Sequence, residues 1–282
     1  MNCDNKKWVK LIYNSNKTVN LMGKDGFEFI GFDKHEINGN TITQEISGVD
    51  GALMGSTTFG PFELNLHFRY TGTDSIDMDL FCFELENKIQ SREPYYVVHS
   101  KMPGIKYLVA PTPKVDTEIL TLRHRDFTIT FTCNKGYSES LYDTNQYDKT
   151  YDKWQFGNGL LVNDDIKYKH NTTSFKIFNG SSDTIAPFPH RHKLIIKLNV
   201  NAPKGFKLIN RTTEDIFEYK KAITKSKQII INGIYPTIDG KRVGIDTNHE
   251  WLTLAPGYND IEIIGTDIIE PTAEFIFPFI YR

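Results

Sequence analysis

Two stretches of strict period-two alternation constrain the fold of this chain most. Between Phe62 and Tyr70, every second residue is Phe, Leu or Tyr, and the residues between them are charged or polar. From Phe127 to Cys133, apolar residues alternate with threonines. Successive side chains of a strand point to opposite faces, so each stretch predicts a strand with one buried and one wet face. Because the two match in length and style, we expect them to pair antiparallel.

Composition extends this prediction to the whole chain. Aromatic residues make up 13% of the 282 residues, led by 19 Phe and 14 Tyr, and such residues fit the half-buried face of a sheet. A chain of this length exceeds one small core, so we predict a mainly β fold in two domains, residues 1–155 and 156–282. The formal net charge is -2 without a basic stripe, which argues against sequence-specific nucleic-acid recognition.

One segment between the two alternating strands has helical periodicity. Asp74 or Ser75 is a suitable N-cap, and the helix should end before Pro94. Residues 94–99 and 105–109 then predict a β-hairpin. The apolar residues at helical spacings are Ile76, Leu80 and Phe83 in one set and Phe81, Leu85 and Ile89 in another.

The second half of the chain again consists of short β patterns, which predict a β-sandwich or jelly roll. We expect strands at residues 194–200, 228–231, 241–245, 251–254, 261–264 and 275–281. Asp239-Gly240 suits a tight turn between the second and third of these strands. Between the two halves, the aromatic-rich segment from Tyr137 to Trp154 is interpreted as the domain connection.

No catalytic motif for nucleotide binding, nucleophilic hydrolysis or zinc proteolysis is present. The best metal-like pair is His190 and His192, but no Cys, His or acid nearby is an obvious further ligand, so we interpret both as exposed polar residues. Asp77 and Asp79 would diverge on a helix. We assign Asp164-Asp165 to a solvated loop. The sequence therefore predicts neither an enzyme nor a cofactor or metal site.

Cysteine usage and the N-terminus bear on compartment. Cys3, Cys82 and Cys133 lack metal-ligand spacing, and their odd number fits a reducing compartment. Cys82 and Cys133 lie on apolar faces, where we expect small core residues. The first ten residues are polar, without the apolar region of a signal peptide, and no stretch predicts a membrane span. We expect synthesis in the cytosol.

The order of several segments resembles a known family. In the first half these are Ile46–Gly51, Phe62–Phe68, the helix, Glu93–Val98, Pro103–Val109 and Phe127–Cys133. In the second half they are Phe175–Gly180, Leu208–Thr213 and Trp251–Asn259. This succession, from about residue 19 to residue 264, resembles phage distal tail proteins of the siphovirus tail component family.

The resemblance implies a hexameric ring at the tip of a long, non-contractile tail. An N-terminal, β-sandwich-like domain with a belt hairpin would form the ring, and a galectin-like β-sandwich would follow it. The ring would join the tail tube protein to the tail-associated lysin, or hub protein, and to receptor-binding proteins. DNA would pass through its channel unrecognised. Such a protein is made in the host cytoplasm, resides at the virion tail tip, does not contact a membrane and has no catalytic residues.

A subunit interface is the candidate functional site that follows. The apolar face of the two alternating strands suits packing on the core or on a neighbouring subunit. The candidate interface residues on this face are Phe62, Leu64, Leu66, Phe68, Phe127, Ile129 and Phe131. Two other functions stay open: a carbohydrate-binding module for host cell-wall attachment, in which exposed tyrosines stack on sugar faces, and a β-rich hydrolase with a scattered active site.

Overall fold

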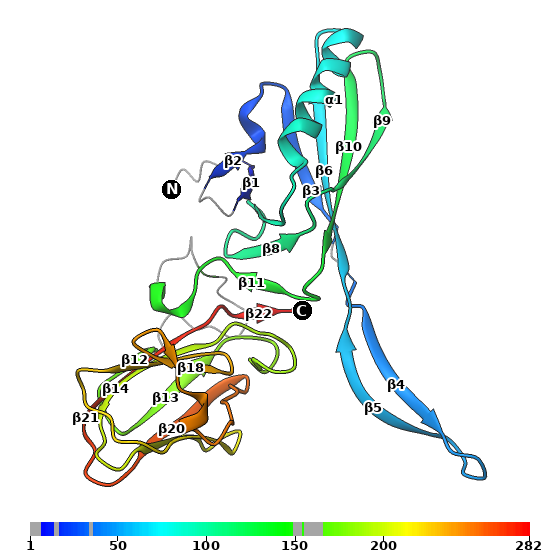
Figure 1. Cartoon of the computed structure of the whole chain (residues 1–282). Coiled ribbons are helices and arrows are strands. Elements are labelled where there is room, and N and C mark those ends of the chain that lie inside the picture. The colour runs from blue at the N-terminus through cyan, green and yellow to red at the C-terminus, as the bar shows by residue number, and fades with distance from the viewer. Residues whose placement is uncertain (1–6, 14–16, 34–35, 149–153, 155–165) are drawn as a thin grey trace. The chain divides into compact units, whose positions relative to one another are not determined.

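The protein divides into two compact units in a computed structural model that describes residues 7–13, 17–33, 36–148, 154 and 166–282. The first unit is Met1–Ser138 with Arg282, and the second is Glu139–Tyr281. Strands dominate both units, and the described residues contain one α-helix (Figure 1). The predicted mainly β fold is confirmed. No helix in the part of the chain that the structure describes is long and apolar enough to cross a membrane.

The first unit is built on a sheet with the strand order β2-β1-β7-β8-β10-β6-β3, to which β9 adds by pairing with β10. Its elements are β1 (Val9–Ile12), β2 (Thr18–Asn20), the 3-10 turn η1 (Leu21–Gly23), β3 (Phe27–Phe32), β4 (Gly39–Glu45), β5 (Ala52–Phe59), β6 (Phe62–Thr71), α1 (Ser75–Ile89), β7 (Tyr95–His99), β8 (Ile105–Val109), β9 (Lys114–Ile119) and β10 (His124–Cys133).

Strands β6 and β10 are the two alternating stretches of the sequence, and they pair antiparallel along their whole length. Phe127 lies opposite Phe68, and Cys133 lies opposite Phe62. The wet face carries the polar cross-strand partners, including the bidentate pair of Arg69 with Asp126 at 2.7 and 2.8 Å. Both strands and their pairing are therefore confirmed.

Two elements cover the apolar face of this strand pair. At one end, Phe81 of α1 contacts the rings of Tyr70 and Phe127, with centroids 4.0 and 5.5 Å apart. At the other end, the hairpin of β7 and β8 folds over the face, where Phe62 meets Tyr107 edge-on at 6.4 Å. The core of the first unit therefore lies between the β6–β10 pair on one side and the β7–β8 hairpin and α1 on the other.

Helix α1 begins and ends where the sequence predicts. The Asp74 side chain accepts a hydrogen bond from the backbone N–H of Asp77 at 2.9 Å, as an N-cap does. At the C-terminus, the Tyr95 hydroxyl donates to the carbonyl of Ile89 at 2.6 Å, and the Tyr13 hydroxyl donates to the carbonyl of Lys88 at 2.8 Å. These two tyrosines satisfy carbonyls that lack partners within the helix.

A buried histidine lies in the core of the first unit. His99 ends β7, is fully buried, and is surrounded by the rings of Phe29, Phe32 and Tyr107. Neither of its ring nitrogens has a hydrogen-bond partner among the described residues. Burial lowers the pKa of His99 from 6.5 to about 4. The folded state therefore holds this side chain neutral.

Acid is expected to destabilise the first unit through His99. Between pH 6.5 and 4, the unfolded chain binds a proton that the folded chain does not, so the free energy of unfolding falls as the pH falls. The loss across this window is about 3 kcal/mol, and none of it occurs above the unfolded-state pKa. Urea denaturation at a series of pH values measures it. His99→Phe should flatten the slope, and an unchanged slope in this variant would contradict the assignment.

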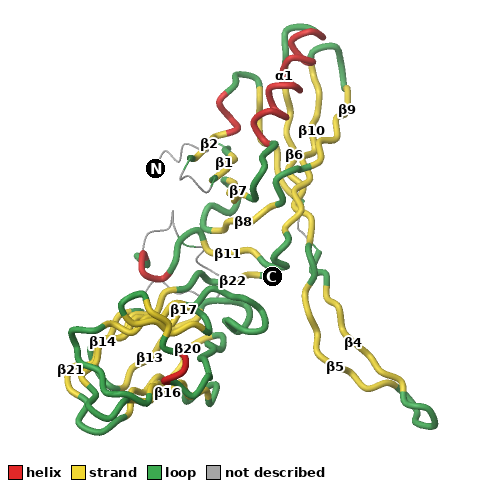
Figure 2. The backbone as a smooth tube through the Cα atoms, in the orientation of Figure 1, coloured by secondary structure: helices red, strands yellow, loops and turns green. Residues whose placement is uncertain are grey.

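The second unit is a β-sandwich of two antiparallel sheets, in the orders β12-β21-β14-β17-β18-β19 and β13-β20-β15-β16 (Figure 2). Its strands are β12 (Lys169–His170), β13 (Ser174–Asn179), β14 (Ile195–Asn201), β15 (Phe206–Asn210), β16 (Asp215–Tyr219), β17 (Gln228–Asn232), β18 (Tyr235–Ile238), β19 (Lys241–Arg242), β20 (Gly257–Ile264), β21 (Ile269–Ile276) and β22 (Ile280–Tyr281). The 3-10 turns are η2 (Thr144–Gln146) and η3 (Gly244–Asp246). Phe175 and Phe275, one from each sheet, meet edge-on at 6.0 Å in the core.

Three of the expected strands of this unit, at 241–245, 251–254 and 275–281, differ from the structure, and the first of them forms only β19 at Lys241–Arg242. The strand at 228–231 pairs with β18, which was not expected, and not with residues 241–245. The missed signal is Asn232-Gly233, a dipeptide typical of tight hairpin turns. Asp239-Gly240 does form a turn with positive φ at both residues, but it joins β18 to β19. Residues 251–254 form an isolated bridge at Leu254 instead of a strand.

The expected closing strand at 275–281 is interrupted. The residues at the interruption pair with the segment after β10 and so attach that segment to the second unit. Strand β21 ends at Ile276, and the next backbone groups bond to the segment after β10. The backbone N–H groups of Phe277 and Phe279 donate to the hydroxyls of Thr144 and Ser140 at 3.1 and 2.9 Å. The short strand β11 (Ser138–Ser140) pairs with β22.

The described part of the aromatic-rich segment belongs to the second unit from Glu139 onward, whereas Tyr137 lies in the first unit. Trp154 is buried, with its ring 5.1 Å from Tyr147 and 5.4 Å from Phe279. The division at Ser138/Glu139 thus lies earlier than the boundary at 155/156 that composition indicated. A segment poor in aliphatic residues looks like a linker in the sequence, but its aromatic rings and hydroxyls complete the core of the second unit.

Candidate functional site

The seven residues predicted as a subunit interface are core residues of the first unit. The exposed fraction of their side chains is 6% for Phe62 and at most 1% for the other six. Helix α1 and the β7–β8 hairpin already cover this face, so a neighbouring subunit cannot pack on these side chains. The sequence left open whether this face packs on the core or on a neighbouring subunit, and in the structure it packs on the core. Any subunit interface must use other residues.

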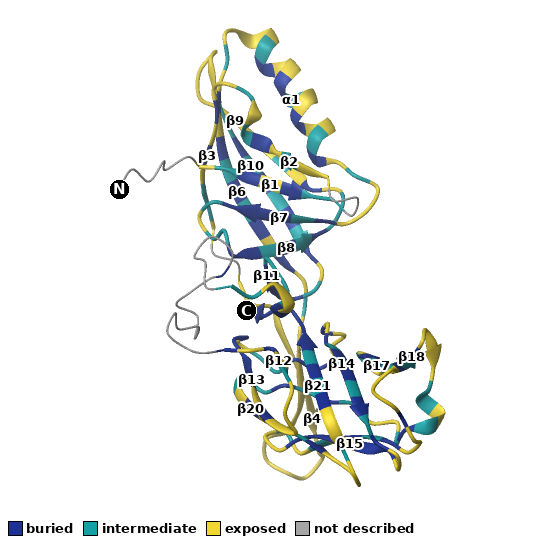
Figure 3. Ribbon diagram, turned by 90° about the vertical axis from the view of Figure 1, so that its left-hand side faces the viewer, coloured by how far each residue is buried: buried dark blue, intermediate teal, exposed yellow. Residues whose placement is uncertain are grey.

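The hairpin of β4 and β5 is the most conspicuous exposed element of the first unit. It forms a two-stranded sheet of its own, and every residue in it is exposed (Figure 3). Four side chains of its two strands are large and apolar, and Leu53 and Met54 are 60% and 78% exposed. We call Ile42, Leu53, Met54 and Phe59 the hairpin surface. An isolated two-stranded hairpin is marginally stable in water.

The outer side of α1 is a second exposed apolar surface. The helix buries Met78, Phe81, Leu85 and Ile89, but Ile76, Leu80 and Phe83 are 62 to 69% exposed. Of the two apolar sets that the sequence showed, only the one with Phe81, Leu85 and Ile89 is buried. Arg125 at the start of β10 bonds to Asp79 and Cys82 of the helix. We call Ile76, Leu80 and Phe83, together with the exposed Ile119, Leu120 and Leu122 that precede β10, the helix surface.

The two histidines considered as metal ligands have different environments. His190 is exposed, but His192 is buried, which corrects the expectation that both are exposed. Its Nδ1 atom lies 3.1 Å from the backbone nitrogen of Ala186 and 3.1 Å from the carbonyl of Thr184. This imidazole therefore stabilises the chain before β14. The described residues contain no group of three His, Cys, Asp or Glu side chains that could hold a metal ion.

The candidate acids have separate partners. Asp77 accepts hydrogen bonds from the backbone N–H of Thr73 at 3.0 Å and the hydroxyl of Tyr70 at 2.9 Å, and these bonds lower the pKa of its carboxyl. Asp79 instead pairs with Arg125 at 3.4 Å. Their divergence on the helix is as predicted. Residues Asp164-Asp165 lie outside the described residues.

The cysteines differ in exposure. Cys133 is fully buried in the sheet, and burial raises the pKa of its thiol to about 12, as expected for a core residue. Cys82 is only partly buried and accepts a hydrogen bond from Arg125 Nη1 at 3.1 Å, which corrects its expected place in the core. Cys3 lies outside the described residues.

Three segments singled out in the second half share one structural feature, a buried asparagine that binds loop backbone. These residues are Asn179, Asn210 and Asn259, each at most 1% exposed. Asn259 accepts from the backbone N–H of Ala255 at 2.9 Å and donates to the Ala255 carbonyl at 2.8 Å. Asn210 donates to Asn259 at 3.0 Å and to the carbonyl of Thr253 at 2.8 Å. The segments therefore hold the loop before β20 in place.

A family model matches the first half of the chain. Residues 16–133 match the model of the phage tail protein RIFT-related domain. The matched region runs from β2 to the end of β10 and includes the β4–β5 hairpin and α1. No curated protein sequence matches the chain.

Solved structures extend the similarity to both units. SPP1 Dit (gp 19.1), described as a paradigm of the hub adsorption apparatus in Gram-positive-infecting phages, has a TM-score of 0.66 and 11% sequence identity, over 96% of this chain and 99% of that chain. A chain of the phage p2 baseplate in its activated conformation with Sr covers 96% of this chain and 97% of its own, at 12% identity and a TM-score of only 0.39. The chain therefore shares the fold of SPP1 Dit, and the resemblance to phage distal tail proteins is confirmed.

Proposed function

We propose that this chain, whose residues 16–133 form a phage tail protein RIFT-related domain, is a structural subunit of a phage tail tip that assembles as a hexameric ring. The similarity to SPP1 Dit over 96% of the chain supports a structural role in a tail or baseplate. In our proposal, the ring joins the tail tube protein to the tail-associated lysin hub and to receptor-binding proteins, and the role requires no catalysis.

The single observation that carries the ring proposal is the exposed β4–β5 hairpin. A ring with cyclic symmetry uses a heterologous interface, so each subunit needs two different surfaces that complement each other. The hairpin surface and the helix surface are two such surfaces on separate elements of the first unit. We propose that the hairpin packs on the adjacent subunit, which would bury its apolar side chains and stabilise the isolated strand pair.

Charge is compatible with a channel that DNA crosses without being recognised. The formal net charge of the chain is -2, and non-specific affinity for DNA comes mainly from basic side chains that neutralise phosphates. A subunit with almost balanced charge should not retain DNA in the ring. The proposed location is the tail tip of the virion.

The native mass of the purified chain tests the proposal directly. We expect static light scattering at micromolar concentration to give six copies of 32.5 kDa. Negative-stain electron microscopy should show rings with a central hole. A single copy of 32.5 kDa under these conditions, with no ring in the images, would contradict the proposal.

A further inference from the structure

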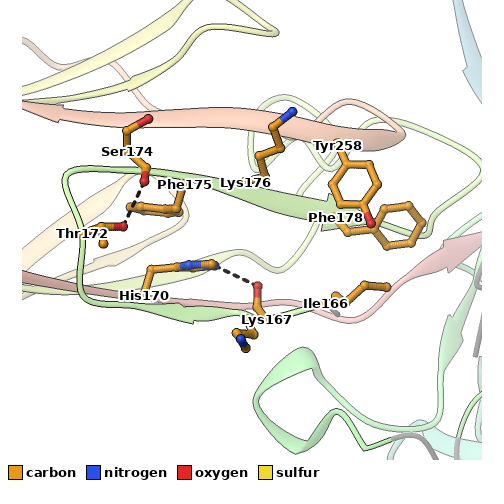
Figure 4. Close-up of a pocket in the computed structure, with 9 residues that line it drawn as sticks. All are labelled: Ile166, Lys167, His170, Thr172, Ser174, Phe175, Lys176, Phe178 and Tyr258. Atoms are coloured by element: carbon orange, nitrogen blue, oxygen red, sulfur yellow. Dashed lines mark hydrogen bonds between the residues drawn. The ribbon is translucent and has the colours of Figure 1, made fainter. Parts of the chain in front are cut away.

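The second unit contains a groove that no step of ring assembly requires. It lies where the edge strands of the two sheets, β12 and β13, run beside each other, and it has a volume of about 620 Å³ (Figure 4). Its size is in the range of small-molecule binding sites. The groove is lined by Ile166, Lys167, His170, Thr172, Ser174, Phe175, Lys176, Phe178 and Tyr258.

The groove offers aromatic and apolar surface on its walls. Phe175 and Phe178 are nearly buried and form the apolar part, whereas the ring of Tyr258 is 49% exposed. Tyr258 lies opposite Phe178 in the pairing of β20 with β13, and the two ring centroids are 5.0 Å apart. Beneath them, the buried Tyr168 donates a hydrogen bond to the Phe178 carbonyl at 3.0 Å. The cross-strand contact with Phe178 therefore places the Tyr258 ring at the groove.

The other wall holds His170. Its imidazole stacks on the ring of Phe175, with centroids 4.4 Å apart and an interplanar angle of 10°. Its Nε2 atom is 2.9 Å from the carbonyl of Lys167. Partial burial lowers the pKa of His170. The ring is therefore neutral at pH 7, so the positive charge of the groove comes from its lysines.

Polar groups line the rim between these aromatic side chains. Thr172 and Ser174 contribute hydroxyls, and Thr172 Oγ1 donates to the Ser174 carbonyl at 2.9 Å. Lys167 and Lys176 contribute ammonium groups, and Lys176 is 3.5 Å from Asp260 with a side chain that is 66% exposed. Among the described residues, the lining includes no carboxylate.

We propose that this groove binds a sugar ring of an anionic polysaccharide. The apolar face of a pyranose would stack on Tyr258, the rim hydroxyls would bond to its hydroxyl groups, and the lysines would attract a phosphate or carboxylate substituent. Stacking on Tyr258 and attraction to the lysines would act on different parts of the ligand, the sugar ring and its anionic substituent. This activity is separate from ring assembly and would operate in a single subunit.

Equilibrium titration of the full chain with three probes tests the proposal: phosphorylated dextran, oligogalacturonate and unmodified dextran. We expect the chain to bind at least one anionic probe more tightly than unmodified dextran, and the preferred anionic probe identifies the substituent. Tyr258→Ala should weaken this binding about tenfold, which corresponds to about 1.4 kcal/mol for the loss of one stacking contact. Lys176→Gln, at an exposed side chain, should reduce binding of the anionic probes only.

Tyr235→Ala is the matched control, because Tyr235 is 54% exposed on β18 of the other sheet. This variant should bind as the unchanged chain does. The proposal is overturned if no probe binds, or if Tyr258→Ala binds like Tyr235→Ala while its thermal unfolding is unchanged. Binding is measured per subunit, so the two proposals can fail independently. A chain that is monomeric but binds a probe would contradict the ring proposal and support the groove proposal.

Discussion

Replacing both Leu53 and Met54 with aspartate is expected to convert the proposed six-subunit ring into single, folded subunits. The two residues are neighbours on β5, so their side chains point to opposite faces of the hairpin. Whichever face lies against the adjacent subunit, one substitution places a carboxylate in the contact. Burying an apolar side chain contributes about 1.5 to 3 kcal/mol, and an unpaired charge adds a desolvation cost.

The dissociation constant of each subunit contact should therefore rise by about a hundredfold or more. Light scattering across a concentration series measures this change. In the free chain both side chains are exposed, so the substitutions remove no contact of the monomer core, and circular dichroism should be unchanged.

The same chemical change on the second unit is the control. Ile245 and Ile269 are 86% and 57% exposed, and replacing both with aspartate should leave the ring intact. If the hairpin variant also remains a ring of six, the hairpin does not form the subunit contact. The helix surface would then be the next candidate, and Leu80→Asp would test it.

Asn259→Ala is expected to lower the free energy of unfolding of the second unit by about 4 kcal/mol. The side chain is fully buried and takes part in hydrogen bonds with Ala255 and Asn210. Its removal leaves the backbone N–H of Ala255 and one N–H of the Asn210 amide without an acceptor. Buried groups that lose their partners cost about 1 to 3 kcal/mol each, and the truncation also leaves a cavity.

Urea denaturation, followed by tryptophan fluorescence, measures this effect. Asn171→Ala is the matched control, since Asn171 is exposed between β12 and β13, and the expected change is within about 0.5 kcal/mol. A loss below about 1 kcal/mol for Asn259→Ala would show that the network contributes little to the stability of the loop.

The elements that depend on local patterns were predictable from the sequence. Alternation defined β6 and β10, because a strand places successive side chains on opposite faces wherever it lies. The N-cap at Asp74 and the turn at Asp239-Gly240 follow equally local rules. The candidate site was not predictable in this way. None of the seven interface residues is available to a partner. The resemblance implied a belt hairpin without saying which residues form it, and the groove at Tyr258 was not identified.

The sequence by itself thus determined the two central strands β6 and β10, where the helix begins and that both halves are β. Only the tertiary structure decided what covers each apolar face. Phe68 and Ile76 are both apolar residues at regular spacings, yet Phe68 is buried against rings of β3 and Ile76 is exposed. Periodicity reports that a face is apolar, but burial depends on elements distant in the chain, such as Tyr107 over Phe62 or Phe279 beside Trp154. Those contacts form only when the chain has folded.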